Sequence, residues 1–185
     1  MTLHTSSQNP SGTDTVAASG QSIYADIVDQ LGITSGQGTL EIDSTQPLFV
    51  TSRTYNQASS GTFGQYLEGV EASEGFSSGE TVWLPHLMQN PDFRCNIGVA
   101  NFGTTAATVR ITLFDAAGVQ LHQFNMNIPP GQVKQDSKPF QTRAGRNDLL
   151  AAYASVRATA GSNIVAYASV VDQQTGDATT VPMRR

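Results

Sequence analysis

The sequence has one cysteine, three histidines and no long apolar run. A single cysteine excludes an intrachain disulfide, so cysteine use says nothing of the redox compartment. A membrane-spanning helix needs about 20 apolar residues, and the first residues have neither the basic segment nor the apolar stretch of a signal peptide. We therefore expect no membrane insertion and no signal within this chain. Charged residues are also few, at 14%, whereas glycine is frequent, at 17 residues. This composition favours short strands joined by turns, and hence an all-β protein.

The residues that usually carry catalysis are scattered. His4, His86 and His122 lie in separate segments without metal-ligand spacing, and one cysteine cannot complete a zinc site. The sequence has no nucleophile-elbow motif and no glycine-rich phosphate loop. We predict no catalytic residues, no cofactor-binding residues and no enzyme activity. Cys95 stands on an alternating strand pattern, so we interpret it as a small buried hydrophobic residue rather than a reactive thiol.

Acidic and basic residues are divided unevenly along the chain. Residues 1–93 hold ten acids and one base, a net charge of −9, while residues 94–185 hold nine bases and five acids, a net charge of +4. This polarity is compatible with head-to-tail docking of units or chains, and also with two unrelated solvated faces. Because binding to a nucleic-acid backbone needs clustered Lys and Arg, we expect no nucleic-acid partner.

One pattern occurs twice. Residues 47–56 align with 163–172, 38–43 with 152–157, 19–21 with 130–132, and 1–4 with 111–114. The second copy is preceded by a strand pattern at residues 93–102 that has no counterpart in the first. Internal repetition predicts two related folding units. We therefore divide the chain into residues 1–75, an incomplete first unit that lacks its initial strand or strands, with the connection, and residues 76–185, a complete second unit.

The first unit is expected to contain strands and one short helix. Residues 1–5 and 13–18 predict a hairpin, and two further strands follow over residues 38–42 and 48–55. Ser22 is a candidate helix cap, and Gly32 stands where helices commonly end, which predicts a helix near residues 22–31. Its apolar side is expected to hold Ile23, Ile27, Val28 and Leu31.

The second unit reads as seven short strands separated by turn residues, a pattern typical of a β-sandwich. The predicted strands cover residues 81–87, 93–102, 109–114, 119–126, 133–136, 149–157 and 163–171. Alternation along them predicts a core containing Ile97, Val99, Ile111, Leu113, Leu121, Phe124, Val156 and Val165.

Residues 57–79 are rich in glycine and serine and form the expected connection between the units. Phe63, Tyr66 and Leu67 recur within this segment, which a freely flexible linker would lack. We therefore expect part of the connection to pack along the side of a unit.

The segments 93–101, 111–115 and 165–172, followed by Thr175-Gly176-Asp177, resemble the tandem immunoglobulin-like β-sandwich repeats of large secreted or surface proteins of environmental bacteria. Most of residues 80–183 fit this pattern, and residues 1–70 fit its later part. The resemblance implies two immunoglobulin-like units in tandem and a place outside the cell or on its surface. It implies no catalytic residue set, because these repeats are functionally uncharacterised.

Two sets of residues are candidates for binding. Asp172 and Asp177 flank a glycine turn and are weak candidates for calcium, although stabilisation of the turn by the Asp side chains explains the same residues. Trp83, Phe63 and Tyr66 are candidate interaction residues: they would form an aromatic platform for sugar rings, or pack in the core or between units.

These observations leave two hypotheses of different classes. The first is a non-catalytic extracellular structural or adhesive module that assembles end to end by β-strand complementation into a filament, since a sandwich that lacks a strand exposes unpaired backbone groups. An upstream stretch of the natural polypeptide would fill the same gap. The alternative is a carbohydrate-binding accessory domain of a secreted hydrolase. Exposed aromatic side chains would support this alternative, namely Trp83, Tyr55, Tyr66 and Tyr153. The expected partners are accordingly copies of itself, neighbouring domains of a larger chain, or carbohydrate.

Overall fold

The computed structural model describes residues 1–59 and 61–185. Half of the chain lies in strands and 6% in helices, which confirms the all-β prediction. In chain order the elements are β1 (Thr2–His4), α1 (Ile27–Gln30), β2 (Thr39–Glu41), β3 (Thr51–Ala58), β4 (Gly61–Glu68), a 3₁₀ turn (Ala72–Glu74), β5 (Thr81–Gln89), β6 (Phe93–Asn101), β7 (Ala107–Asp115), β8 (Gln120–Ile128), β9 (Val133–Ser137), α2 (Pro139–Thr142), β10 (Leu149–Ala160), β11 (Ile164–Asp172) and β12 (Ala178–Pro182).

The chain forms two compact units, Met1–Leu48 and Phe49–Arg185. The repeat placed the division between residues 75 and 76 instead. The difference arises because the hairpin of β3 and β4 is tied to the C-terminal strand β12. The Thr180 hydroxyl donates to the Tyr66 carbonyl, and the Gly64 N–H donates to the Asp177 carboxylate at 3.2 Å. Part of the expected connection therefore does pack along the side of a unit, as the strand β4.

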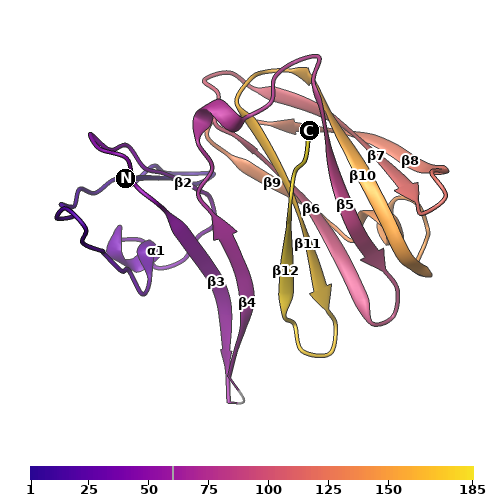
Figure 1. Cartoon of the computed structure of the whole chain (residues 1–185), viewed down its shortest axis with the longest axis horizontal. Helices are drawn as coiled ribbons and strands as arrows, with labels where there is room; N and C mark the ends of the chain where they lie inside the picture. Colours follow the sequence, from indigo (N-terminus) through magenta and orange to yellow (C-terminus); the bar gives the residue numbers. More distant parts are fainter. Residues whose placement is uncertain (60) are drawn as a thin grey trace. The chain divides into compact units, whose positions relative to one another are not determined.

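The larger unit contains a β-sandwich of two four-stranded antiparallel sheets, with strand orders β5-β10-β7-β8 and β12-β11-β6-β9 (Figure 1). All seven strands predicted for residues 81–171 are present. The eighth, β12, was not predicted, because Ala178–Pro182 is short, rich in threonine and ends in a proline. It forms the edge of its sheet, where proline is tolerated.

The core lies between these two sheets. Of the eight predicted core residues, Ile97, Val99, Ile111, Leu113 and Val156 have no exposed surface and belong to the core. Val165 is also buried, but it is not part of the core cluster, which takes Ile164 and Ala166 from β11 instead. Leu121 and Phe124 are only partly buried and pack against the core from β8. The reason is their place in the fold, since β8 is the edge strand of its sheet.

The smaller unit holds a two-stranded antiparallel sheet of β1 and β2. The predicted partner of the first strand, residues 13–18, is wrong: this segment forms no strand, and only an isolated bridge joins Thr2 to Ser11. Asp14 explains the difference. Its carboxylate accepts hydrogen bonds from the Ser22 and Tyr24 hydroxyls at 2.7 and 2.5 Å, which hold the segment in a loop and lower the pKa of Asp14.

The predicted helix exists but is shorter, because Ser22 is not its cap. Asp26 caps it instead, accepting hydrogen bonds from the backbone N–H groups of Val28 and Asp29 at 2.9 and 3.1 Å. The helix end is as predicted, with Gly32 in the left-handed region at φ +77°. A second helix, α2, was not predicted; it is a single turn that begins at Pro139 and buries Phe140.

The register of β1–β2 matches that of the strands with which the predicted repeat aligns it. The repeat aligns Leu3 with Leu113 and Leu40 with Ala154. In the structure Leu3 lies opposite Leu40 in β1–β2, and Leu113 lies opposite Ala154 in β7–β10. All three residue pairs of β1–β2 coincide in this way, so the sequence alignment and the strand pairing agree. Thr2↔Glu41, Leu3↔Leu40 and His4↔Thr39 correspond to Thr112↔Ser155, Leu113↔Ala154 and Phe114↔Tyr153.

Candidate functional site

The open edge of β3 is the first feature that points to a function. β3 pairs with β4 over eight residues without a bulge, and within the described residues β4 is its only ladder partner. The Gly69 N–H donates to the Val50 carbonyl at 2.8 Å, so even-numbered residues of the strand face β4. The N–H and C=O groups of the odd-numbered residues Thr51, Arg53, Tyr55 and Gln57 therefore face away from β4.

The corresponding strand of the second copy, β11, has both edges occupied. Its even-numbered residues bond β12, as in the Asp172 N–H to Asp177 carbonyl bond of 2.9 Å. Its odd-numbered residues bond β6, as the Phe102 N–H to Asn163 carbonyl bond of 3.0 Å shows. The repeat aligns Thr51, Arg53 and Tyr55 with Tyr167, Ser169 and Val171 of β11. The open groups of β3 are thus the counterparts of the groups by which β11 binds β6.

The side chains of β3 leave this edge accessible. All eight residues of the strand are exposed. Its one charged side chain, Arg53, is held within the hairpin, donating to the Thr62 carbonyl at 3.3 Å and hydroxyl at 3.1 Å, with its guanidinium 5.4 Å from the centre of the Tyr55 ring. Edge strands are normally protected by lysine, proline, bulges or short length. β3 has none of these protections.

The hairpin itself is rigidly specified. Gly64 lies opposite Tyr55, and a Cβ at Gly64 would stand 2.2 Å from the Thr54 carbonyl oxygen, so only glycine fits there. Next to it on β4, the Gln65 side-chain nitrogen is buried and has no hydrogen-bond partner within the described part of the chain. The hairpin therefore keeps its shape while its outer edge stays open.

Apolar exposure is concentrated in the same part of the chain. Seven of the ten exposed large hydrophobic side chains lie in the first 70 residues. Of the 28 buried hydrophobic residues, only two lie in that part of the described chain. Leu48 and Phe49 are 46% and 81% exposed, whereas the residues aligned with them, Ile164 and Val165, are buried. The first copy thus lacks the covering that the second copy has.

The structure does not bring the three predicted interaction residues together. Phe63 and Tyr66 belong to β4 and, three residues apart on a strand, point to opposite faces of it. Trp83 lies on β5, with its ring centre 5.9 Å from that of Tyr153 and 6.3 Å from that of Phe114. The sequence analysis missed Phe114. Its place beside Tyr153 depends on the pairing of β7 with β10, in which the two residues lie opposite each other.

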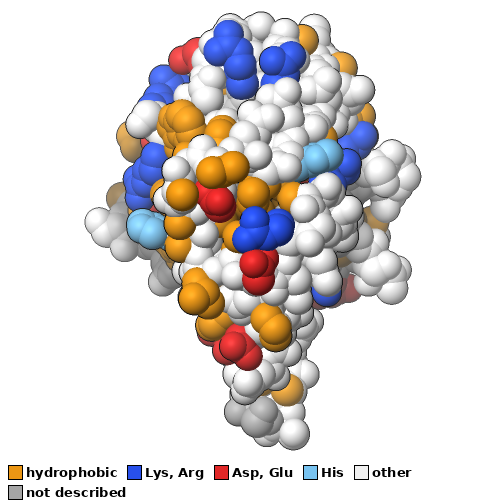
Figure 2. Space-filling view, turned by 90° about the vertical axis from the view of Figure 1, so that its right-hand side faces the viewer, with side chains coloured by type: hydrophobic (Ala, Val, Ile, Leu, Met, Phe, Trp, Pro, Cys, Tyr) orange, Lys and Arg blue, Asp and Glu red, His pale blue; other side chains and the backbone are white. Residues whose placement is uncertain are grey.

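This aromatic cluster on the outer face of the β5-β10-β7-β8 sheet is largely self-contained. The Phe114 and Tyr153 rings stack, with centres 4.8 Å apart and planes 10° apart, so each covers one face of the other. Trp83 is the most open of the three, at 43% exposure. On the side of the molecule shown in Figure 2, hydrophobic side chains are interrupted by charged ones.

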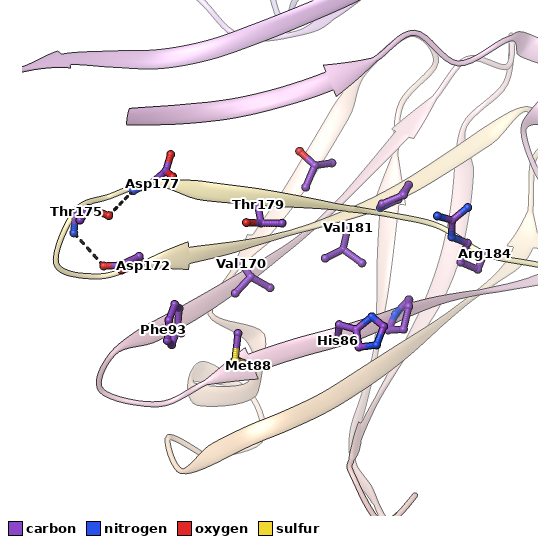
Figure 3. Close-up of a pocket in the computed structure, with 13 residues that line it drawn as sticks. His86, Met88, Phe93, Val170, Asp172, Thr175, Asp177, Thr179, Val181 and Arg184 are labelled. Atoms are coloured by element: carbon purple, nitrogen blue, oxygen red, sulfur yellow. Dashed lines mark hydrogen bonds between the residues drawn. The ribbon is translucent and has the colours of Figure 1, made fainter. Parts of the chain in front are cut away.

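A groove of about 710 Å³ lies between the edge strands β5 and β12 (Figure 3). At one end the two strands are joined by backbone hydrogen bonds between Trp83 and Arg184, at 2.8 and 2.9 Å. His86 lines the groove with φ +56°, at the place where the pairing of β5 with β10 shifts register. The lining is mixed, with apolar Met88, Phe93, Val170 and Val181 beside threonines and the two acids of the β11–β12 turn.

Those two acids, Asp172 and Asp177, are engaged by the chain itself. The Asp172 carboxylate accepts the backbone N–H groups of Gln174 and Thr175 at 2.7 and 3.0 Å, and the Asp177 carboxylate accepts that of Gly64. The described residues contain no group of three or more His, Cys, Asp or Glu side chains placed to hold a metal. Turn stabilisation thus accounts for Asp172, and a hydrogen bond to β4 accounts for Asp177, without calcium. The absence of a cofactor stays a prediction.

Asp172 gives a pH-dependent prediction. Hydrogen bonds from the backbone N–H groups of Thr175 and Gln174 lower the pKa of Asp172 below its usual 3.8. A lowered pKa contributes stability above the unfolded value, and this contribution is lost as the pH falls through the folded value. In thermal unfolding, the wild type should therefore exceed Asp172→Asn in midpoint at pH 7, and the difference should shrink below pH 3.8. An unchanged difference at pH 3 would contradict this account.

Cys95 is buried in the sandwich core with no exposed surface, and burial raises the pKa of its thiol to about 12. This confirms its interpretation as a small buried hydrophobic residue. We expect a thiol reagent to modify Cys95 only as fast as the sandwich unfolds, because only the exposed thiolate reacts. Labelling in increasing urea, followed by mass spectrometry, measures this rate. Complete labelling of the folded protein within seconds would contradict the buried position.

The three histidines lie on three different strands, β1, β5 and β8. The nitrogen Nε2 of His4 lies 2.7 Å from the Glu41 carboxylate across the β1–β2 pair, while His86 lines the groove and His122 lies 6.3 Å from Phe124 between ring centres. This arrangement joins no nucleophile, base and acid into one site. The expectation that the protein is not an enzyme stays a prediction.

Comparisons with known proteins identify no family. No family model matches the chain, and no curated protein matches it. Among solved structures, the chain is similar to the crystal structure of Thermotoga maritima 1070, at 12% identity and a TM-score of 0.46, covering 58% of this chain and 94% of that one. A likeness this distant carries no argument about function. None of the helices in the described part of the chain is long and apolar enough to cross a membrane.

Proposed function

We propose that the chain is a non-catalytic structural or adhesive module of a secreted or surface protein, which joins a neighbour by strand addition at the open edge of β3. The observation that carries this proposal is the match between the two copies. β3 corresponds to β11, yet the edge that β6 occupies on β11 is open on β3.

The energetics of an open edge favour such a junction. An added antiparallel strand would supply partners to four N–H and four C=O groups, and it would shield exposed apolar side chains of the first copy. Contacts of this kind between unlike surfaces build rows or filaments when the rotation between neighbours does not close them into a ring. The resemblance to repeats of secreted proteins and the low charge content support the extracellular part of the proposal.

Light scattering coupled to size-exclusion chromatography, over a wide concentration range, tests this function. If copies of the chain supply the missing strand to each other, the mean mass should rise with concentration and show no fixed end point. If only another segment supplies it, the chain should be monomeric alone and should associate when a polypeptide carrying an unpaired β6-type strand is added. A monomer under both conditions would contradict the proposal.

The aromatic cluster supports a second candidate, carbohydrate binding, because Trp83 exposes 43% of its surface next to two further rings. The test is migration in native gels that contain soluble polysaccharides. Retardation that is lost in Trp83→Ala, but kept in Tyr66→Ala, would favour this alternative. Equal migration with and without polysaccharide would remove its support.

A further inference from the structure

We infer that the strand that occupies the open edge of β3 is an antiparallel strand with the pattern of β6, Phe93–Asn101, supplied by a segment of another repeat of the same kind that is not already paired within a sheet. The inference rests on the proposed function and specifies its partner. The chain holds one example of the complete arrangement, in which β6 lies beside β11 over nine residue pairs. That example fixes both the direction and the register of the incoming strand.

The backbone groups on the two edges correspond one by one. On β11, Tyr167, Ser169 and Val171 lie opposite Gly98, Asn96 and Arg94 of β6. Transferred through the repeat, Thr51, Arg53 and Tyr55 would lie opposite the strand positions equivalent to Gly98, Asn96 and Arg94. Both edges present the N–H and C=O groups of odd-numbered residues, so no shift of register is needed for every group to find a partner.

The side chains of this register place no like charges directly opposite each other. Arg53 would face an asparagine, and Tyr55, whose ring centre lies 5.4 Å from the Arg53 guanidinium, would face an arginine. Thr51 would face a glycine, which leaves room for it. No like charges are opposed, and like charges directly opposite each other destabilise a strand pair.

The apolar face of the incoming strand distinguishes this partner from a second copy of β3. On β6, Cys95, Ile97 and Val99 alternate along the strand and have no exposed surface. The residues of β3 that share the corresponding face, Ser52 and Thr54, are polar. Two β3 strands paired edge to edge would thus gain hydrogen bonds but bury little apolar surface, whereas a β6-type strand supplies both.

The charges of the chain point the same way. Strand β6 begins the basic part of the chain, with a net charge of +4 over residues 94–185, while β3 belongs to the acidic part, with −9 over residues 1–93. Association of a β6-type strand from one repeat with the first copy of another would therefore be steered by opposite charge and weakened by salt.

A peptide probe tests the inference. The probe is a dye-labelled nonapeptide with the sequence of residues 93–101 that carries Cys95→Ser, and its fluorescence anisotropy is followed on titration with the intact chain. We expect saturable binding that is at least about tenfold weaker for a control peptide carrying Asn96→Pro, because the N–H of Asn96 is one of the donors that β6 directs toward β11, and proline removes it. Equal affinity of both peptides would overturn the inference.

Variants of the chain locate the binding edge. Tyr55→Pro removes an outward N–H of β3, and Tyr55→Thr keeps it while removing the ring. We expect Tyr55→Pro to weaken binding of the peptide by about tenfold or more, because the junction loses one hydrogen bond and the strand is locally distorted. We expect Tyr55→Thr to change the affinity for the peptide by less than about threefold. If both variants bind as the wild type does, the peptide occupies another surface and the inference fails.

Amide exchange measured residue by residue by NMR separates the possible outcomes and needs no variant. Bound peptide should slow exchange at Thr51, Arg53, Tyr55 and Gln57, while the even-numbered amides stay protected by β4. Slowing of the same four amides with rising concentration of the chain alone, without an effect of peptide, would overturn the partner but keep the proposed junction at β3. Fast exchange at these amides under every condition would overturn both.

Discussion

Replacing Asn101 by alanine should lower the free energy of unfolding by roughly 3 kcal/mol or more, because it leaves several buried backbone groups without partners. Asn101 has no exposed surface. Its side-chain nitrogen donates to the Thr105 and Ile128 carbonyls at 2.8 and 3.0 Å, and its side-chain oxygen accepts the Gly103 N–H at 2.9 Å. These bonds tie the end of β6 to the loop before β7 and to the end of β8.

Urea unfolding followed by the fluorescence of Trp83, the single tryptophan, measures the loss. The matched control is Asn127→Ala on β8, where the asparagine is exposed and its side-chain oxygen accepts a hydrogen bond from the Thr108 hydroxyl. We expect this control to stay within about 0.5 kcal/mol of the wild type. Equal losses for the two variants would contradict the structural role of Asn101.

Phe76→Ala should have an effect of similar size, a loss of about 3–5 kcal/mol, because removing a buried ring leaves a cavity. Phe76 has no exposed surface, lies in the sandwich core, and exchanges backbone hydrogen bonds with Ile164 at 2.8 and 3.0 Å. The residue therefore fastens the segment before β5 to the start of β11.

The chain offers a control with the same chemistry. Phe49 is 81% exposed, so Phe49→Ala should change the free energy of unfolding by less than about 0.5 kcal/mol. The two variants are compared by urea unfolding under one set of conditions. A large loss for Phe49→Ala would mean that this side chain is covered in the folded protein, and would contradict the exposed first copy on which the proposed function rests.

Strands with strong alternation could be predicted from the sequence, whereas elements fixed by a few specific contacts could not. Alternation is clear in β6, with Cys95, Ile97 and Val99, and in β7, with Val109, Ile111 and Leu113, whereas β9 has a single apolar residue and was predicted from the turn residues before it. Strand β4 lies in a segment rich in glycine and serine, where Gly64 is needed for close approach to Tyr55 and not for flexibility. Composition alone therefore indicated a connection where the structure has a strand.

The helix shows a second limit of prediction. Both Ser22 and Asp26 are good helix caps by residue type, and only tertiary contact decides between them. The Ser22 hydroxyl is engaged by Asp14, eight residues earlier in the chain, so Asp26 remains as the cap. A single sequence without known contacts could not reveal this competition.

The candidate site was predictable in part. Repetition indicated that the first copy lacks a strand, and the alignment of residues 47–56 with 163–172 selects the strand with an open edge. The alignment did not show which backbone groups face that edge. The hydrogen bond between Val50 and Gly69 decides whether the even-numbered or the odd-numbered residues of β3 face β4. The aromatic residues were misleading as a set, because Phe63 and Tyr66 are separated from Trp83 by their strands.

The most direct test of the account is amide exchange along β3 in the dilute, monomeric chain, measured by NMR. An open edge predicts a strict alternation: slow exchange at Ser52, Thr54 and Asn56, which face β4, and fast exchange at Thr51, Arg53 and Tyr55, which face away from it. Equal protection of both sets in the monomer would mean that another part of the chain already covers the edge. That result would contradict the account, since no junction could then form at β3.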